Sequence, residues 1–425
     1  MKAARLSLVG AALLAASPAT AVQPLEVFLK AAREQNPDAQ QASANLAQQK
    51  AQALVALGRQ LPGVAAEATY SRNQYHVLLN IPGAEPLETQ KFNVWSGNVT
   101  LRVPLVDLAN FQRISAANTN AESSGHTLES TRLAVEGQTV QDYFQLLANI
   151  ALVATAQNYL EVSRENLRLT QAKLSAGTAT RLDVDRAVAD VEQQVQQLAA
   201  AELQVALAAR DLQSTTSIAP DISSAQELID DLHPEPELAT FEANLRNVPS
   251  VAAAVSNTRA AEQQANVEKF ALLPSLAGTF TEFGTNAPGF QPANWYWQAA
   301  ITASWSFDVT NVGNIRGSDA AADAARAQEL KVRLNAGDAI HRYWQTVGAD
   351  IAQSRSARAQ RDAAVHAADQ ARVQYRAGTA TQLDLLQAQR DAFRAEVTRI
   401  QNDANLLNAR AQLRLSTGRS LLPQR

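Results

Sequence analysis

The stretch Ala176-Gly177-Thr178-Ala179-Thr180-Arg181-Leu182-Asp183 returns as Ala377-Gly378-Thr379-Ala380-Thr381-Gln382-Leu383-Asp384, displaced by 201 residues from position 176 to position 377. Each copy lies between two long helical patterns. A repeat of this length exceeds the few tens of residues of a solenoid period, so the chain is interpreted as a duplicated half-protein. Asp107 and Asp308 keep the same offset, which supports the duplication.

The repeated stretch has the chemistry of a turn between two helices. Gly177 can adopt the left-handed conformation that ends a helix. Thr180 can cap the next helix, and Asp183 three residues later completes a capping box. This local role explains the turn, but it does not explain why two distant hairpins keep nearly the same tip while their helices diverge. We therefore expect a partner to dock on the tip residues, which are Gly177, Thr178, Ala179, Gly378, Thr379 and Ala380.

The composition favours helices and argues against nucleic acid as a partner. Hydrophobic residues make up 46% of the 425 residues, but only 5% are aromatic, and much of the apolar fraction is alanine. Alanine has the highest helix propensity. The net charge of −4 gives no basic excess for binding phosphates.

The N-terminus has the pattern of a secretory signal. Lys2 and Arg5 precede an apolar run over residues 6–16, and Ala19-Thr20-Ala21 predicts cleavage before Val22. The alternative is a buried N-terminal helix. The chain has no cysteine, so we expect neither disulfides nor a lipid anchor on a cysteine thiol.

Alternating segments predict one long β-hairpin in each half, within about residues 62–107 and 274–310. Apolar and polar residues alternate over residues 98–105 and 297–308, with weaker upstream partners at 64–71 and 276–281. No later stretch approaches the roughly 18 apolar residues of a membrane helix, so any membrane segment would be a β-barrel. The alternative is a sheet with one face on a soluble core.

Aromatic residues favour lipid on the apolar face of these strands. Most of the tryptophans gather at one place, where Trp295, Tyr296, Trp297 and Trp305 suggest an interfacial girdle. Four strands cannot close a barrel by themselves, since the smallest spanning barrels need about eight and open edges in lipid leave backbone groups unpaired. The arithmetic allows eight strands in a dimer, twelve in a trimer, or more.

The rest of the chain is predicted as two long helical hairpins, at about residues 110–218 and 317–416. Their first helices run over about 110–173 and 317–376 without proline. A coiled-coil stripe follows the first turn, at Val184, Val188, Val191, Val195, Leu198, Val205 and Leu212. The last helix has two adjoining apolar stripes, which predicts packing on two sides. Residues 219–249 are expected to connect the halves, as short helices or as a solvated linker.

With the signal peptide and the paired strands and helices, the signatures at residues 173–184 and 375–389 resemble the TolC-type outer-membrane efflux proteins. The resemblance covers the chain from residue 22 onward, with repeats at 22–218 and 250–425. It implies a homotrimer with a twelve-stranded barrel in outer-membrane lipid and a twelve-helix periplasmic tunnel. The tips would meet a periplasmic adaptor (a membrane fusion protein) coupled to an inner-membrane pump of the resistance-nodulation-division or ABC type, and substrates would pass passively.

The resemblance also implies a gate at the periplasmic end, with Asp183, Tyr375, Asp384 and Gln387 at the matching positions. Two residues depart from the family pattern. Gln387 replaces the second acidic residue, and Ala380 replaces an arginine just after the tip threonine. The polar network that closes the tunnel is therefore expected to be thinner.

No enzymatic, metal or cofactor site is expected. The five histidines are scattered without metal-ligand spacing, and no nucleophile elbow or phosphate loop occurs. A type I protein-secretion duct remains an alternative with the same architecture. A trimeric coiled-coil adhesin is a second alternative, although it needs no duplicated hairpins.

Overall fold

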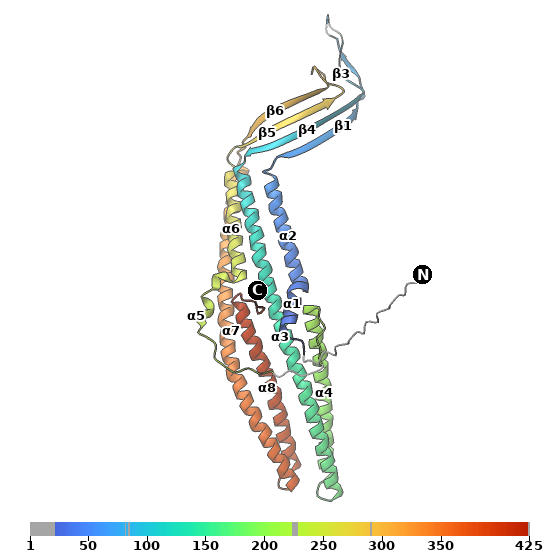
Figure 1. The fold of residues 1–425 in the computed structure, drawn as a ribbon, viewed down its shortest axis with the longest axis vertical. Helices are drawn as coiled ribbons and strands as arrows, with labels where there is room; N and C mark the ends of the chain where they lie inside the picture. Colours follow the sequence, from blue (N-terminus) through green and yellow to red (C-terminus); the bar gives the residue numbers. More distant parts are fainter. Residues whose placement is uncertain (1–21, 81, 84–85, 223–227, 290, 424–425) are drawn as a thin grey trace, which may run out of the picture. The chain divides into compact units, whose positions relative to one another are not determined.

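The computed structural model describes residues 22–80, 82–83, 86–222, 228–289 and 291–423 (Figure 1). The predicted signal peptide at residues 1–21 lies outside the described residues. The chain divides into two compact units. Of the described residues, the first takes in those within 22–39, 132–243 and 339–423, and the second those within 40–131 and 244–338.

The chain is mostly helical, as predicted, and four long helices occur in the predicted order, although the third begins at Val309 and not near residue 317. The helices are α1 (Leu25–Gln35), α2 (Pro37–Gly58), α3 (Leu108–Ser175), α4 (Arg181–Thr216), α5 (Leu238–Glu242), α6 (Pro249–Phe270), α7 (Val309–Ala377) and α8 (Gln382–Ser416), with a 3-10 turn at Leu245–Asn247. The helices α1, α2 and α6 had not been predicted.

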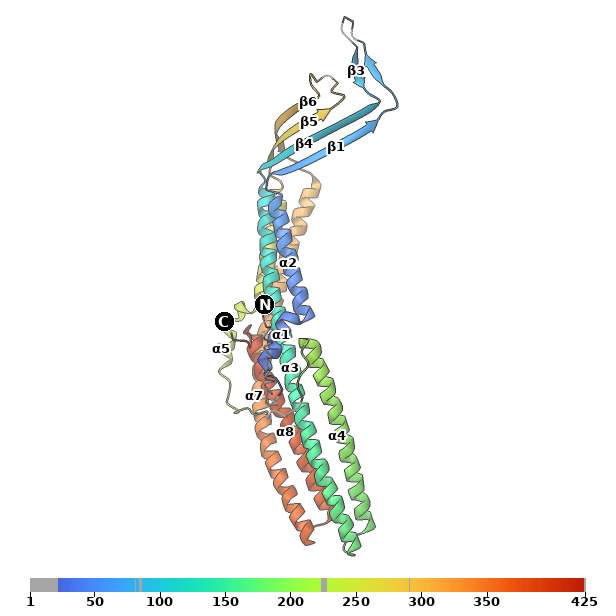
Figure 2. The same ribbon diagram turned by 45° about the vertical axis from the view of Figure 1, so that its right-hand side comes forward.

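In the first unit, α3 pairs with α4 and α7 pairs with α8, and each pair is joined by one copy of the repeated turn (Figures 1 and 2). Its main core gathers where α1, α3 and α4 meet. Phe28, Leu146 and Leu212 are fully buried there. The close spacing of Phe28 and Leu29 with two alanines one turn later gives α1 a single apolar face.

The last helix, α8, is buried on two sides, as its two stripes predict. Leu385 and Leu386 are both buried although they are adjacent in sequence. On one side, Phe393 packs edge-on against Tyr159 of α3, with ring centroids 5.1 Å apart. On the other side, Asp403 accepts hydrogen bonds from α7. The stripe on α4 is only half buried, since Val188 and Val195 are exposed.

Residues 228–236 form a strap that the buried guanidinium of Arg410 holds against α8. Its Nη atoms donate to Asp230, to Glu235 and to the carbonyl of His233, and its Nε lies 2.9 Å from Oδ2 of Asp230. The strap is therefore not helical, and it is anchored at the buried Asp230 although Ile229, Asp231 and His233 stay exposed. Beyond it, α5 and the 3-10 turn are short helices, as the first of the two interpretations of this connector predicts.

The second unit contains an antiparallel sheet with strand order β1-β4-β5-β6 (Figure 1). Its strands are β1 (Gly63–Arg72), β4 (Asn93–Val106), β5 (Ser275–Thr285) and β6 (Trp295–Ser304). A two-stranded ribbon of β2 (Val77–Leu79) and β3 (Leu87–Gln90) extends the first hairpin. The two predicted hairpins thus join into one sheet through the pairing of β4 with β5, where Thr100 faces Thr281.

The predicted strand end at Asp308 was wrong, because β6 ends at Ser304. The alternation continues through Phe307, but Asp308 begins the next helix instead. Its Oδ1 accepts the backbone N–H of Asn311 at 3.1 Å. Asp107 does the same for Asn110 at 2.8 Å. Asp107 and Asp308 thus have the same role in the two halves, since each caps the N-terminus of a long helix.

Candidate functional site

The first tip is closed by its own backbone. Gly177 has φ +75°, in the left-handed region that the sequence predicts. Its N–H donates to the Leu174 carbonyl at 2.9 Å, and the N–H of Thr178 reaches back to the Lys173 carbonyl at 2.8 Å. This pattern satisfies the last carbonyls of α3. Gly177 and Thr178 are exposed, and Ala179 is half-buried.

The second tip repeats this geometry closely. Gly378 has φ +78°. Its N–H donates to the Tyr375 carbonyl at 3.2 Å, and the N–H of Thr379 donates to the Gln374 carbonyl at 2.9 Å. Gly378 and Thr379 are exposed and Ala380 is half-buried, as their counterparts are.

Both predicted capping boxes are present. The N–H of Asp183 donates to Oγ1 of Thr180 at 3.2 Å, and the Asp183 carboxylate accepts the Thr180 N–H at 2.9 Å. Thr381 and Asp384 exchange the same two bonds at 3.2 and 3.0 Å. Each tip therefore carries a complete set of caps made from its own residues.

The caps also hold the two carboxylates in the charged form. The hydrogen bond from the Thr180 backbone, followed by one from its hydroxyl, lowers the pKa of Asp183 below its ordinary value. For Asp384 the Thr381 hydroxyl lowers the pKa most, followed by the backbone N–H. A lowered pKa in the folded state means that the cap is intact above the ordinary carboxyl range and is lost only as the pH falls through the lowered value. The tips therefore keep their caps in mildly acidic medium.

The predicted gate residues Asp183 and Tyr375 have separate partners in this chain. The Asp183 carboxylate is bound to Thr180, as described above. The Tyr375 hydroxyl lies 3.2 Å from Oγ1 of Thr170, and Tyr375 is 5% exposed. Nζ of Lys173 donates to the Tyr375 carbonyl and lies 3.9 Å from the centre of its ring. The link between the two hairpins at the tip thus runs through Lys173 and Thr170 of α3.

A second link passes from hairpin to hairpin just above the caps. Nε2 of Gln382, the first residue of α8, donates to the Asp183 carbonyl at 2.6 Å. Asp183 therefore joins the hairpins through its backbone and not through its carboxylate. Asp384 and Gln387 are both exposed.

A third set of contacts lies two helical turns farther from the tips. Oδ1 of Asp190 on α4 lies 3.2 Å from Nε of Arg390 on α8, and Oδ2 of Asp190 accepts a short hydrogen bond from Ser163 of α3. Nearby, Asn166 donates to the buried Gln389. Sequence reasoning missed all of these residues. Asp190 lies beside the stripe predicted on α4 and not on it, so the periodicity gave no reason to expect this carboxylate in the interior.

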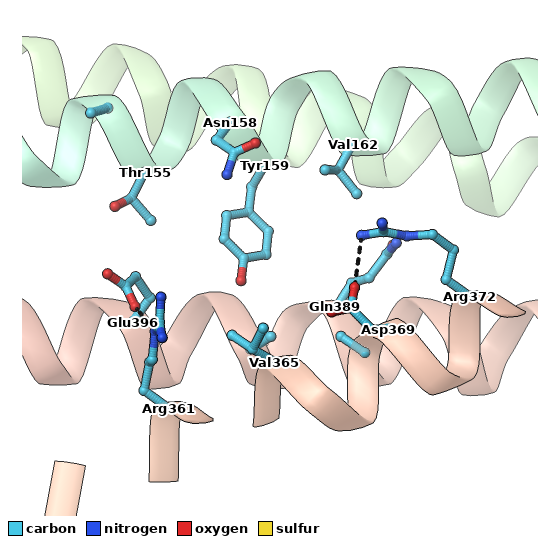
Figure 3. Close-up of a pocket in the computed structure, with 13 residues that line it drawn as sticks. Thr155, Asn158, Tyr159, Val162, Arg361, Val365, Asp369, Arg372, Gln389 and Glu396 are labelled. Atoms are coloured by element: carbon cyan, nitrogen blue, oxygen red, sulfur yellow. Dashed lines mark hydrogen bonds and ion pairs between the residues drawn. The ribbon is translucent and has the colours of Figure 1, made fainter. Parts of the chain in front are cut away.

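A cavity of about 550 Å³ opens between α3 and α7, with α8 as its floor (Figure 3). Tyr159 reaches from α3 toward Val365 of α7 (Figure 3). Burial raises the pKa of its hydroxyl, and the Glu396 carboxylate adds to the effect. Burial alone would raise the pKa of Glu396, but hydrogen bonds from Arg399 and Arg361 outweigh it and lower that pKa. The charges of the cavity wall are thus already paired with one another.

The predicted aromatic cluster lies on and beside the outer strand β6. Trp295, Trp297 and Trp305 are each more than 60% exposed. Tyr296 stacks on Phe283 with centroids 5.0 Å apart, and Trp297 stacks on Phe280 at 5.9 Å. Strand β6 thus has large exposed aromatic side chains, and two of its rings, those of Tyr296 and Trp297, stack on phenylalanines of β5.

The described residues were also compared with the requirements of membrane-spanning helices and of metal sites. Over the described ranges, no helix combines the length and apolarity that crossing a membrane requires. Among the residues that the structure places, no group of three or more histidine, aspartate or glutamate side chains could hold a metal ion.

Comparison with known proteins identifies the family. The sequence profile of the family described as "Outer membrane efflux protein" matches residues 28–216 and 241–419. The chain therefore belongs to the outer membrane efflux protein family, and it is an outer-membrane efflux channel protein.

Individual relatives are distant but similar over most of their length. The toluene efflux pump outer membrane protein TtgC of Pseudomonas putida is 24% identical over 93% of this chain and 82% of its own. The cobalt-zinc-cadmium resistance protein CzcC of Cupriavidus metallidurans is 26% identical over 67% of this chain and 68% of its own. The solved outer membrane channel CmeC of Campylobacter jejuni has the same fold, with a TM-score of 0.78 at 18% identity over 93% of this chain and 86% of that one.

Proposed function

We propose that three copies of this chain form an exit duct, in which three four-stranded sheets close a twelve-stranded barrel and the long helices form a twelve-helix periplasmic tunnel. The open sheet carries this proposal. The outer strands of the sheet are β1 and β6. In lipid the free edges of such strands need backbone partners, and a neighbouring copy supplies them.

The helices support the same assembly. Along α4, apolar side chains of the predicted coiled-coil stripe stay exposed, with Val188 at 41% and Val195 at 39%. Leu203 and Leu207 on the same helix are at least half exposed. A ring of chains would cover these side chains with the next subunit and remove them from water.

Each chain contributes two repeats to the duct, at residues 22–218 and 250–425, joined by a connector at 219–249. The names of the relatives mention substrates from toluene to cobalt, zinc and cadmium. This range supports a duct that accepts what its pump delivers, so that selection lies mainly with the pump, of the resistance-nodulation-division or ABC type. The exposed Trp295, Tyr296, Trp297 and Trp305 would lie at the interface between outer-membrane lipid and water.

Native mass spectrometry of the detergent-extracted protein tests the assembly. The expected result is a trimer. A stable monomer would contradict the proposal, because its sheet edges would then be open in the membrane. An adhesin of three coiled-coil chains would also be trimeric, so the trimer must in addition form channels in planar lipid bilayers.

The exposed tips are the proposed docking site for the periplasmic adaptor, through Gly177, Thr178, Ala179 and their counterparts Gly378, Thr379 and Ala380. Replacing Gly177 or Gly378 with valine forces a β-branched residue into the left-handed region, at a cost of about 1–2 kcal/mol or more. We expect drug export in cells to fall while the trimer persists in the outer membrane. Gly348→Val, at an exposed helical position with open space around it, is the matched control. Loss of the trimer in the tip variants would assign these glycines a structural role only.

The proposed gate at the same end consists of Asp183, Tyr375, Asp384 and Gln387. Three exposed Asp384 carboxylates in a trimer would make one acidic ring. Gln387→Asp would add a second ring one helical turn away, so we expect the preference for cations over anions to increase. Asp384→Asn should lower it. Reversal potentials in a salt gradient measure both, and unchanged values in both variants would remove these positions from the pore.

A further inference from the structure

The contact between Asp190 and Arg390 joins a buried carboxylate to a guanidinium that is partly open to solvent. Asp190 is 4% exposed, and its carboxylate has one partner in each hairpin, Ser163 in the first and Arg390 in the second. Arg390 is partly exposed, with 41% of its side chain open to solvent. The guanidinium therefore reaches inward from the surface of one hairpin to a carboxylate inside the other.

The seam around this pair is polar over two helical turns. Gln194 and Gln389 are buried on the facing helices, and Asn166 donates to Oε1 of Gln389. Within the part of the chain that the structure describes, Nε2 of Gln389 and Oε1 of Gln194 have no hydrogen-bond partner. Leucines at these places would pack without leaving polar atoms unpaired. The seam is thus weaker than the helices could make it.

An ion pair with a buried carboxylate is a poor means of joining two elements permanently, since well-packed apolar residues stabilise such an interface equally well or better. It is suited to an interface that separates, because carboxylate and guanidinium are both well solvated in water once they part. An apolar seam would instead expose hydrocarbon on opening, at about 25 cal/mol per Å².

The geometry points to Asp190 and Arg390 as the positioning pair that holds the α7–α8 hairpin against α3–α4 in the conformation of this structure and that parts when the duct opens. This inference rests on the proposed function and deepens it. It places the main polar link between the hairpins two turns above the tip residues. The tip itself contributes Lys173, Thr170 and Gln382.

Two kinds of variant with opposite expected effects test the pair. Asp190→Asn removes the charge from the buried carboxylate, and the open-to-closed ratio of single channels in bilayers should rise about 10-fold, the size of a hydrogen bond to a charged group. Asp190→Leu combined with Arg390→Leu replaces the pair with apolar contact, and it should keep channels closed and reduce drug export below wild type. The charge exchange Asp190→Arg with Arg390→Asp should restore part of the wild-type ratio.

A purely structural pair predicts a different pattern. The leucine variant would then conduct and export as wild type does, and this result would overturn the inference. The control is Glu161→Gln, which removes an exposed ion pair with Arg164 on α3, with 71% and 54% of the two side chains exposed. It should leave the open-to-closed ratio unchanged. If the wild-type protein itself formed no channel, the proposed function would fail, whereas unchanged variants of a conducting wild type would contradict only the role of this pair.

Discussion

Replacing Arg410 with methionine is expected to detach the strap at residues 228–236 and to destabilise the protein by about 3–5 kcal/mol. Arg410 is 6% exposed, and its guanidinium is bound by two carboxylates, of which Asp230 is almost fully buried and Glu235 nearly so. Methionine fills a similar volume but leaves both charges without this partner. Removing one member of a buried charged group costs more than the group contributes as a whole, because the remaining charge stays desolvated.

Two measurements check this prediction. The thermal unfolding midpoint of the detergent-solubilised protein should fall by several degrees, and hydrogen exchange should accelerate first in peptides that cover residues 228–236. Arg355→Met, at an exposed position on the same helix as Arg358, is the control and should change neither quantity. A strap that stayed protected in Arg410→Met would mean that Arg358, which donates to the Asp230 carbonyl, holds it alone.

Glu136→Leu is the second substitution with a large expected effect, at about 3 kcal/mol of destabilisation. Glu136 is fully buried in α3. It accepts from Arg33 of α1 at 2.9 Å and from Ser420 and the N–H of Leu421 at 2.9–3.1 Å. This one carboxylate therefore ties the first helix and the C-terminal segment to the middle of the chain.

We expect Glu136→Leu to lower the thermal midpoint and to make residues 417–423 sensitive to carboxypeptidase. Glu161→Gln again serves as the control, because that carboxylate is exposed and exposed ion pairs contribute about 0–1 kcal/mol. If Glu136→Leu unfolded at the wild-type temperature, the burial of the carboxylate would have no energetic role.

Short-range chemistry made the tips predictable residue by residue. Three residues determine the turn: the glycine that takes a positive φ, the threonine that caps the next helix, and the aspartate three positions later. They all act within eight residues, so their order in the sequence is enough to predict the conformation of the turn. The same holds for the strand alternation. The alternation predicted the wrong end only for strand β6, because Trp305 and Phe307 continue the alternating apolar pattern although Asp308 begins α7.

The partners across the hairpins could not be predicted in this way. Periodicity tells which face of a helix is buried, but not which residue of another helix meets it. Thr170 and Tyr375 are 205 positions apart, and Asp190 and Arg390 are 200 apart. The helix α2 was missed for another reason. Its sequence is rich in alanine and glutamine, and it has no sharp apolar stripe for a periodicity argument to find.

The self-contained caps of the tips restrict how an adaptor could control the duct. The hydrogen bonds that close the turn at Gly177 and Thr178 and that form the Thr180–Asp183 capping box all come from the same hairpin, so the turn keeps one shape whichever way the hairpins lean. A ligand that binds two states equally well shifts no equilibrium between them, however tightly it binds. Contact with the turn alone can therefore recruit an adaptor, but it cannot shift the equilibrium between the closed and the open duct. To open the duct, the adaptor must bind helix surfaces whose spacing differs between the closed and the open state. Mutations should therefore be able to abolish opening without abolishing recruitment of the adaptor.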